Sequence, residues 1–167
     1  FGPAPRDVDP DVLPIDRLEA ALIAGKILCY AQGFGMIAAA GREFEWDFEL
    51  PAIARIWRAG CIIRSAMLDD MATALGEDPA RNLILAPHFA GLLQQTHNDL
   101  RAVVGAAALY GIATPALGAG LAYFDTMRTA RGTANMIQGQ RDYFGLHGFE
   151  RLDDGRGGQH GPWADQG

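Results

Sequence analysis

The chain has very little of several residue types on which common binding sites depend. Among its 167 residues there is one lysine, Lys26, and one serine, Ser65. Lysine and arginine together number 14 against 20 acidic residues, so the net charge is −6. No basic run or lysine-rich arm is present, and we therefore expect no nucleic-acid binding. An anionic ligand would have to be held by a few local cations, because the overall field repels it.

Cysteine and histidine are also too scattered for the usual redox and metal motifs. Cys29 and Cys61 form no CxxC pair and lie in apolar, helix-like sequence, which predicts reduced thiols in the core. No HExxH or Cys/His cluster is present, and the histidines are His88, His97, His147 and His160. We predict no metal site, with His88 at a helix start and His97 on a solvated face.

Long apolar runs and phosphate-binding loops are missing too. No uninterrupted apolar run reaches the roughly 18 residues of a membrane span, and the chain does not open with a basic and then apolar leader. Gly33-Phe-Gly35 lies inside a helical pattern with no strand before it, so it is not a nucleotide-binding loop. These absences predict a cytoplasmic protein that contacts no membrane.

The residues that are present predict an all-α fold. Hydrophobic residues make up 49% of the chain and charged residues 20%, which is typical of a globular domain. No segment alternates with a period of two, so no sheet is expected. Proline and glycine signals predict about six helices with short connections. The expected helical ranges are 16–40, 50–60, 61–75, a short turn after Asp78, 87–110, 116–129 and 134–144. Arg58-Ala-Gly60 is expected to bend or break the helix before 61–75 continues it.

The predicted organisation has three parts. Residues 1–15 read as a linker or arm, residues 16–147 as the helical domain, and residues 148–167 as a Gly-rich tail. Asp16 and Glu19 have the spacing of a capping box at the first helix. Glycines inside that helix (Gly25, Gly33 and Gly35) destabilise it, so they predict close approach of another helix.

The tail ends in an unusual motif, His160-Gly-Pro-Trp163. A tryptophan buries much apolar surface when it docks. Two alternatives stay open from the sequence: a disordered terminus, or docking of His160 and Trp163 on a partner.

One stretch carries the best candidate for a binding site, Asn135-Met-Ile-Gln-Gly-Gln-Arg-Asp-Tyr-Phe-Gly-Leu-His147. It predicts a helix, capped by Thr133 and ended by Gly145, that delivers Arg141 and His147 to its end. Arginine is a fixed cation whose planar fork suits phosphate or carboxylate, and histidine adds a tunable donor. The alternative is an arginine in a surface ion pair beside a helix-end histidine.

A second arginine group surrounds Trp57. Arg55, Arg58 and Arg64 either recognise an anion or form helix ion pairs. Adjacent carboxylates at Asp69-Asp70 point apart and predict a solvated face, not an acid/base pair.

Three motifs in order resemble decarboxylating 6-phosphogluconate dehydrogenases. They are Lys26-Ile-Leu-Cys-Tyr-Ala-Gln-Gly-Phe34, Ile56-Trp-Arg-Ala-Gly-Cys-Ile-Ile-Arg-Ser65 and the stretch 135–147. The resemblance runs from about Leu18 to Trp163. It covers the C-terminal half of that family's large helical domain and its tail.

The resemblance implies a function. The family is a homodimer that oxidises 6-phosphogluconate with NADP in the pentose phosphate pathway, releasing carbon dioxide and ribulose 5-phosphate. Its N-terminal Rossmann domain binds NADP. By resemblance, Arg141 and His147 are the residues that bind substrate in the neighbouring subunit's active site. The family's catalytic lysine and glutamate and its cofactor domain precede the region matched here, so this chain alone is expected to be inactive, with no catalytic residue.

Two departures and two rival functions remain. The family usually has His-Thr-Asn-Trp at the tail, where this chain has His160-Gly-Pro-Trp163, and Thr133 stands where the family has proline.

The first rival is a catalytically inactive helical dimerisation module, favoured by the glycine-spaced first helix. The second is a small-anion-binding domain that uses the Arg55–Arg64 cluster.

Overall fold

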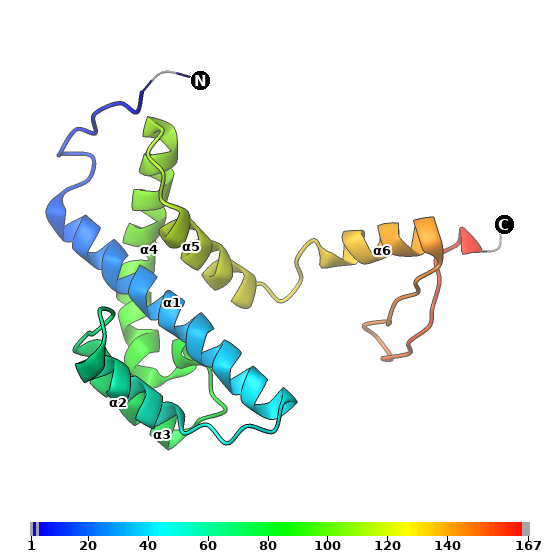
Figure 1. Cartoon of the computed structure of the whole chain (residues 1–167). Coiled ribbons are helices and arrows are strands. Elements are labelled where there is room, and N and C mark those ends of the chain that lie inside the picture. Colours follow the sequence, from blue (N-terminus) through cyan, green and yellow to red (C-terminus); the bar gives the residue numbers. More distant parts are fainter. Residues whose placement is uncertain (1, 3, 165–167) are drawn as a thin grey trace. The chain divides into compact units, whose positions relative to one another are not determined.

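The computed structural model describes residues 2 and 4–164 and is helical (Figure 1). In the described residues the only extended pairing is an isolated antiparallel bridge between Phe149 and Gln159, which confirms the all-α prediction. The elements in order are α1 (Ile15–Glu43), α2 (Leu50–Gly60), α3 (Met67–Glu77), the 3₁₀ helix η1 (Leu83–Leu85), α4 (Pro87–Tyr110), α5 (Pro115–Met127) and α6 (Ala134–Gly145).

The chain forms two compact units, Phe1–Phe124 and Asp125–Gly167, and the division falls in the last turns of α5. The domain boundaries predicted after residues 15 and 147 stay predictions. The outermost residues of the predicted arm and tail, 1, 3 and 165–167, lie outside the described residues.

The first unit is built on the long helices α1 and α4, which pack against each other (Figure 1). The helices α2 and α3 form a second packed pair, and η1 contacts α1, α3 and α4. Apolar side chains at helical spacing from each element meet in one core. Its fully enclosed members include Ile27, Leu28, Phe34, Leu68, Met71, Phe89 and Leu100.

By length and composition α1 is apolar enough to cross a membrane, with a mean hydropathy of 1.4 in its most apolar window. In the structure this helix buries Ala24, Ile27 and Leu28 completely in the core. A core helix of this kind passes the same test, since burial in protein and burial in lipid select the same side chains.

The helix α4 has the bounds that the sequence predicts. It begins at Pro87 and ends at Tyr110, with Gly111 at φ 77° in the left-handed conformation beyond its end. Proline suits the first turn because its missing N–H would have no helical partner, and glycine tolerates positive φ. The start of α2 at Leu50, with Pro51 in its first turn, is confirmed for the same reason.

The beginning of α1 differs from the prediction. The capping residue is Pro14, no side chain caps the helix, and Asp16 lies inside the first turn. The predicted capping box is therefore absent. Close approach is confirmed at Gly25, where an added Cβ would lie 2.4 Å from Leu117 of α5, but nothing lies near Gly33.

Residues 61–66 do not continue the helix. The backbone is extended at Cys61, and α3 begins only at Met67. Side chains of α1 hold this loop: Lys26 Nζ donates to Ser65 Oγ at 3.0 Å, and the Tyr30 hydroxyl donates to the Ile63 carbonyl at 2.5 Å. Tertiary bonds thus override the helical tendency of the segment.

Other local predictions fail in smaller ways. The short helical turn lies at 83–85 rather than directly after Asp78, whose carboxylate accepts from the amides of Ala80 and Arg81. Thr133 precedes α6 but forms no side-chain capping bond. Cys29 is exposed and Cys61 is partly buried, so the prediction of core thiols is wrong, although both are free.

The N-terminal arm is fastened to the end of α4. Arg6 donates from its backbone N–H to the Tyr110 carbonyl at 3.1 Å and from Nη2 to the Leu109 carbonyl at 2.9 Å. Its guanidinium lies over the Tyr110 ring, 5.3 Å from the centroid. This combination of hydrogen bonds and a cation–π contact fixes the arm where it passes α4.

The second unit consists of α6 and the C-terminal segment that folds back on it. The bridge between Phe149 and Gln159 closes a loop, with N–H···O distances of 2.8 and 3.1 Å. The centre of this unit is Asp142, a residue of α6 that is 0% exposed. A buried carboxylate at such a place requires full hydrogen bonding.

Candidate functional site

Arg141 and His147 lie together at the C-terminal end of α6. Both are exposed, and both line one surface hollow of about 370 Å³. The remaining walls come from the same helix: Ile137, Gln140, Phe144 and Gly145. The hollow thus offers a guanidinium fork and an imidazole above apolar side chains, an arrangement suited to an anionic group on a larger ligand.

The turn after α6 brings His147 back against the helix. Leu146 adopts φ 49° and ψ 41°, a left-handed conformation that is uncommon for a residue with a Cβ. The His147 ring lies against the backbone of Gly145, where an added Cβ would be 3.0 Å from ring atoms. Gly145 therefore has a second role besides ending the helix, because the absence of a side chain leaves room for the imidazole of His147.

Asp142 is the residue on which the second unit converges. Its Oδ1 accepts from the Gly148 amide at 2.8 Å and lies 2.6 Å from His160 Nδ1. Its Oδ2 accepts from the Gly161 amide and from the Trp163 indole Nε1, each at 2.8 Å. Because an ionised carboxylate can only accept, the His160 Nδ1 must carry its proton in this contact.

These donors determine the charge state of Asp142. Burial raises the pKa of its carboxyl, but hydrogen bonds from the Gly161 amide, the His160 ring, the Gly148 amide and the Trp163 indole lower it by more. The net pKa lies far below the ordinary value of an aspartate, so Asp142 is an anion at neutral pH.

The tail residues named from the sequence have partners in their own chain. His160 and Trp163 both bond Asp142 of the same chain, while disorder of the terminus and docking on a partner stay predictions. The indole also lies over the backbone of Gly161, where an added Cβ would be 2.2 Å from the ring. Glycine in place of the family's usual threonine makes this position of Trp163 possible.

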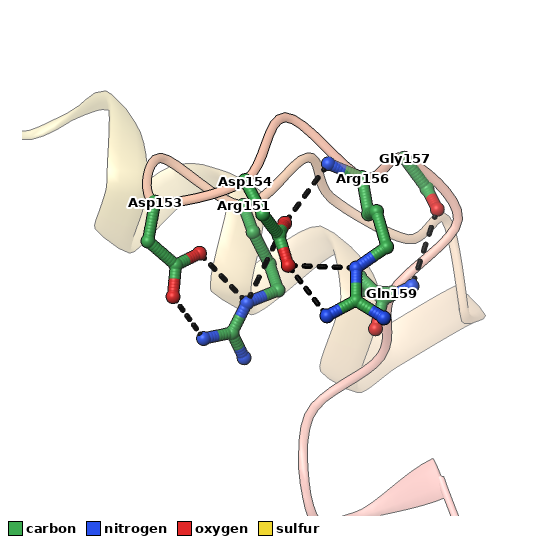
Figure 2. A network of polar contacts seen from close by, with 6 residues as sticks. All are labelled: Arg151, Asp153, Asp154, Arg156, Gly157 and Gln159. Carbon is green, nitrogen blue, oxygen red and sulfur yellow. Dashed lines mark hydrogen bonds and ion pairs between the residues drawn. The ribbon is translucent and has the colours of Figure 1, made fainter.

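The loop between the two bridge residues is held by ion pairs (Figure 2). Arg151 pairs with Asp153, and Arg156 pairs with Asp154. The neighbouring guanidiniums lower the pKa of both carboxyls. All four side chains point into solvent, so these pairs shape the loop but add little stability.

Gln138 of α6 contacts both Arg141 and the turn that carries His147. Its Nε2 donates to the Gly148 carbonyl at 2.5 Å, and its Oε1 accepts from Arg141 Nη1 at 3.3 Å. One amide therefore contacts both the arginine and the residue after His147.

The first unit contains a second hollow, of about 610 Å³, with two cations in its lining. Lys26 of α1 and Arg64 of the 61–66 loop line it together with apolar residues, among them Trp57, Ile62 and Leu117. Lys26 is held by Ser65, and neither cation forms an ion pair among the described residues. Sequence reasoning missed Lys26, although a sole lysine inside an otherwise apolar helix is an available signal.

Tyr30 of α1 lines this hollow and is hydrogen-bonded to the 61–66 loop, which also lines it. Its ring packs near Phe34 and Trp57, with centroid distances of 6.4 and 6.5 Å. Burial, and to a lesser degree the neighbouring Cys61, raise the pKa of the Tyr30 phenol. The phenol therefore stays protonated and keeps its hydrogen bond to the Ile63 carbonyl.

Among the arginines around Trp57, the structure gives an ion pair for Arg58. Arg58 Nε bonds Asp69 Oδ2 at 2.9 Å, which is the ion-pair alternative, and Arg64 lines the hollow described above. The predicted solvated face at Asp69 is thus partly neutralised.

The two histidines of the first unit, His88 and His97, contact other side chains of that unit. His88 stands 3.7 Å from Asp70, a long contact between exposed groups. His97 is not on a solvated face: it packs 5.4 Å from the Phe124 ring, and its Nδ1 is buried. Among the described residues no group of three potential ligands could hold a metal ion.

Comparison with known proteins identifies the family. A model described as the 6-phosphogluconate dehydrogenase C-terminal domain matches residues 6–163. The chain is 46% identical over 151 residues to the chloroplastic decarboxylating 6-phosphogluconate dehydrogenase 2 of Spinacia oleracea, covering 90% of this chain and 28% of that protein. It is 44% identical over 152 residues to the decarboxylating 6-phosphogluconate dehydrogenase of Escherichia coli K12, covering 90% and 32%.

A solved structure agrees. The 6-phosphogluconate dehydrogenase of Plasmodium falciparum, studied in its apo form, with NADP+ and with 6-phosphogluconate, superposes with a TM-score of 0.86 at 34% identity. The match covers 96% of this chain and 34% of that one. This chain spans about a third of the length of these relatives.

The fold and the matches define an all-α C-terminal domain of a dehydrogenase. The chain belongs to the 6-phosphogluconate dehydrogenase family, in the part that its C-terminal domain model describes.

Proposed function

We propose that this chain is the C-terminal domain of an NADP-dependent decarboxylating 6-phosphogluconate dehydrogenase of the pentose phosphate pathway. In this role it forms the homodimer and supplies Arg141 and His147 to the substrate site of the neighbouring subunit. The chemistry itself, and NADP, belong to N-terminal regions that the matched relatives carry in addition to this part. We expect residues 1–167 alone to be inactive, and the full protein to be cytoplasmic.

The observation that carries the proposal is the shared hollow at the end of α6. Arg141 and His147 are both exposed there, and neither is used by an ion pair among the described residues. A guanidinium fork and an imidazole are the groups expected to hold a phosphorylated sugar acid. The match to a 6-phosphogluconate dehydrogenase whose structure was studied with that substrate supports 6-phosphogluconate as the ligand of the hollow.

Dimer formation is supported by apolar side chains that the second unit leaves exposed. Phe144 is 83% exposed, and Met136, Ile137, Tyr143 and Leu146 are also exposed. An apolar surface of this kind on one short helix is typical of a protein interface.

Replacement of Arg141 tests the substrate role. In the enzyme that joins residues 1–167 to the family's N-terminal regions, Arg141→Ala should raise KM for 6-phosphogluconate by about a hundredfold, because an oxyanion loses a charged partner worth ~3 kcal/mol. Arg156→Ala is the matched control, since Arg156 pairs with Asp154 in the loop. Steady-state NADPH formation measures both, and an unchanged KM in Arg141→Ala refutes the role.

A hybrid dimer tests whether the pair acts in the neighbouring subunit. One subunit carries Arg141→Ala, and the other carries a replaced N-terminal catalytic lysine. If Arg141 serves the neighbour, the hybrid contains one complete site and regains activity that neither parent has. If Arg141 serves its own subunit, every site lacks one group and the hybrid stays inactive.

The inactive dimerisation module remains the second candidate, because the same apolar surface supports it. Sedimentation of the 167-residue chain addresses it, and a strictly monomeric chain at high concentration excludes it. A dimer that gives no activity with the N-terminal regions present would favour the module over the enzyme domain.

We infer that Lys26 and Arg64 provide a further anion contact. They line one hollow, lie in two of the motifs that mark the family, and have no carboxylate partner among the described residues. Lys26→Met should raise KM for 6-phosphogluconate with little loss of fold, and calorimetry with 6-phosphogluconate on the isolated chain should show weak or no binding. Tight binding by the isolated chain would instead favour a stand-alone anion-binding domain.

A further inference from the structure

The turn that carries His147 has a backbone conformation that needs external support. Leu146 and Gly148 both have positive φ, at 49° and 72°. For a leucine this conformation is unfavourable and persists only where surrounding contacts determine it. His147 lies between these two residues, so whatever holds the turn also places the imidazole.

Asp142 holds the turn from the helix side. Its backbone carbonyl accepts from the Leu146 amide at 2.8 Å, and its carboxylate accepts from the Gly148 amide at 2.8 Å. Both residues that flank His147 are therefore bonded to Asp142. The same helical turn carries Arg141, one residue earlier.

The C-terminal segment holds Asp142 in place. His160, Gly161 and Trp163 supply three donors to its two carboxylate oxygens, at 2.6 to 2.8 Å. The carboxylate is completely buried, so each donor lost would leave a charge without a replacement from water. The tail, the carboxylate and the His147 turn form one hydrogen-bonded assembly.

We propose that Asp142 is a positioning residue for substrate binding, through which the C-terminal segment fixes the His147 turn beside Arg141. This inference rests on the proposed function of Arg141 and His147. Asp142 itself does not touch the ligand, because its oxygens are enclosed and directed to the four donors. The tail then contributes to substrate affinity through a bonded carboxylate rather than through its own contact.

Two variants remove this link in different ways. Asp142→Asn keeps the shape but turns an NH₂ group toward donors that need an acceptor, so one side of the assembly must break. Trp163→Phe keeps a six-membered aromatic ring and removes the indole N–H together with the five-membered ring, and it serves as a second test if Asp142→Asn does not fold. Asp153→Asn is the matched control, an exposed carboxylate of the same unit that pairs with Arg151.

NMR of the 167-residue chain gives a readout of position. We expect the Gly148 amide and the His147 ring signals to shift in Asp142→Asn and in Trp163→Phe, and to stay in place in Asp153→Asn. Unchanged His147 and Gly148 signals in Trp163→Phe would overturn the link between the tail and the turn.

Kinetics of the enzyme that includes the N-terminal regions give the functional readout. Loss of positioning should raise KM for 6-phosphogluconate in Asp142→Asn by about tenfold or more, with a smaller rise in Trp163→Phe and none in Asp153→Asn. A lowered thermal midpoint with unchanged KM would show a purely structural role and overturn the proposal. If Arg141→Ala leaves KM unchanged, the proposed function fails. If Arg141→Ala raises KM and Asp142→Asn does not, only this inference fails.

Discussion

The contact between Gly145 and His147 shows how one missing methyl group sets the shape of the candidate site. The imidazole occupies the space in which a Cβ would lie, 3.0 Å from two ring atoms. The carbon would be too close for an ordinary contact, so the ring would have to move by a few tenths of an ångström. The shape of the hollow thus depends on a glycine that has no functional side chain of its own.

Gly145→Ala should therefore weaken substrate binding without weakening the helix. We expect a several-fold rise in KM for 6-phosphogluconate while α6 gains up to ~1 kcal/mol from the better helix former. Gly139→Ala is the control, since nothing lies within 4 Å of the added carbon. Equal KM values for the two variants in the NADPH assay would contradict the prediction.

The buried Asp142 predicts how the tail responds to acid. Its pKa in the folded chain is lowered, so its contribution to stability is fully present above the unfolded pKa, about 4, and is lost as the pH falls further. The paired Asp153 and Asp154 add to the trend with the same sign.

The measurement is the Trp163 indole N–H signal across a pH titration. We expect it to keep its shift from pH 8 down to about 4 and to lose it only below that value. In Asp142→Asn the steep acid dependence should be absent. A wild-type signal that disappears near pH 6 would show that another group controls the tail.

At this scale the sequence supplied part of the site. Cations at a helix end made Arg141 and His147 candidates, and the family resemblance rather than the pattern gave them their expected role. Asp142 could not, because its donors lie up to 21 residues away and an acid beside an arginine has the pattern of a surface residue. Only the folded chain shows that its carboxylate is enclosed.

At the scale of elements, stability of the first unit depends on the core between α1 and α4. Phe89 is 0% exposed near the start of α4, while Leu109 near its end is 75% exposed. A buried phenylalanine leaves a cavity when truncated, whereas an exposed leucine loses little that water cannot replace.

Phe89→Ala should lower the free energy of unfolding by about 3–5 kcal/mol. Leu109→Ala should change it by less than about 0.5 kcal/mol. Urea denaturation followed by circular dichroism measures both. Similar values for the two variants would mean that α4 does not pack as described.

The elements were predictable where local signals act alone. Proline and glycine mark both ends of α4, and its bounds agree with the prediction. The segment 61–66 has an apolar, helix-like sequence, yet Lys26 and Tyr30 of α1 hold it as a loop. Contacts between residues more than 30 positions apart leave no periodicity to read, which explains the error.

At the scale of the whole chain, the two units each form their own contacts, and the segment between α5 and α6 lies near the start of the second unit. This segment lies outside the helices and contains the exposed residues Arg128 and Arg131. Exposed, irregular segments are where proteases cut first, because the chain must enter the protease extended.

Brief treatment with trypsin should therefore cut first after Arg128 or Arg131. Arg17 should resist, since it lies in α1 and bonds Asp99 at 3.2 Å. Mass spectrometry of the earliest fragments identifies the site. A first cut after Arg17 would contradict the prediction that the segment between α5 and α6 is cut first.

The anchoring of the tail has a consequence for genetic changes just before Trp163. Trp163 supplies one of four donors to an enclosed anion, so a premature stop codon just before it would leave that anion short of a bond that solvent cannot provide. Such an allele would lack no residue of the ligand hollow and would still behave as a loss-of-affinity allele.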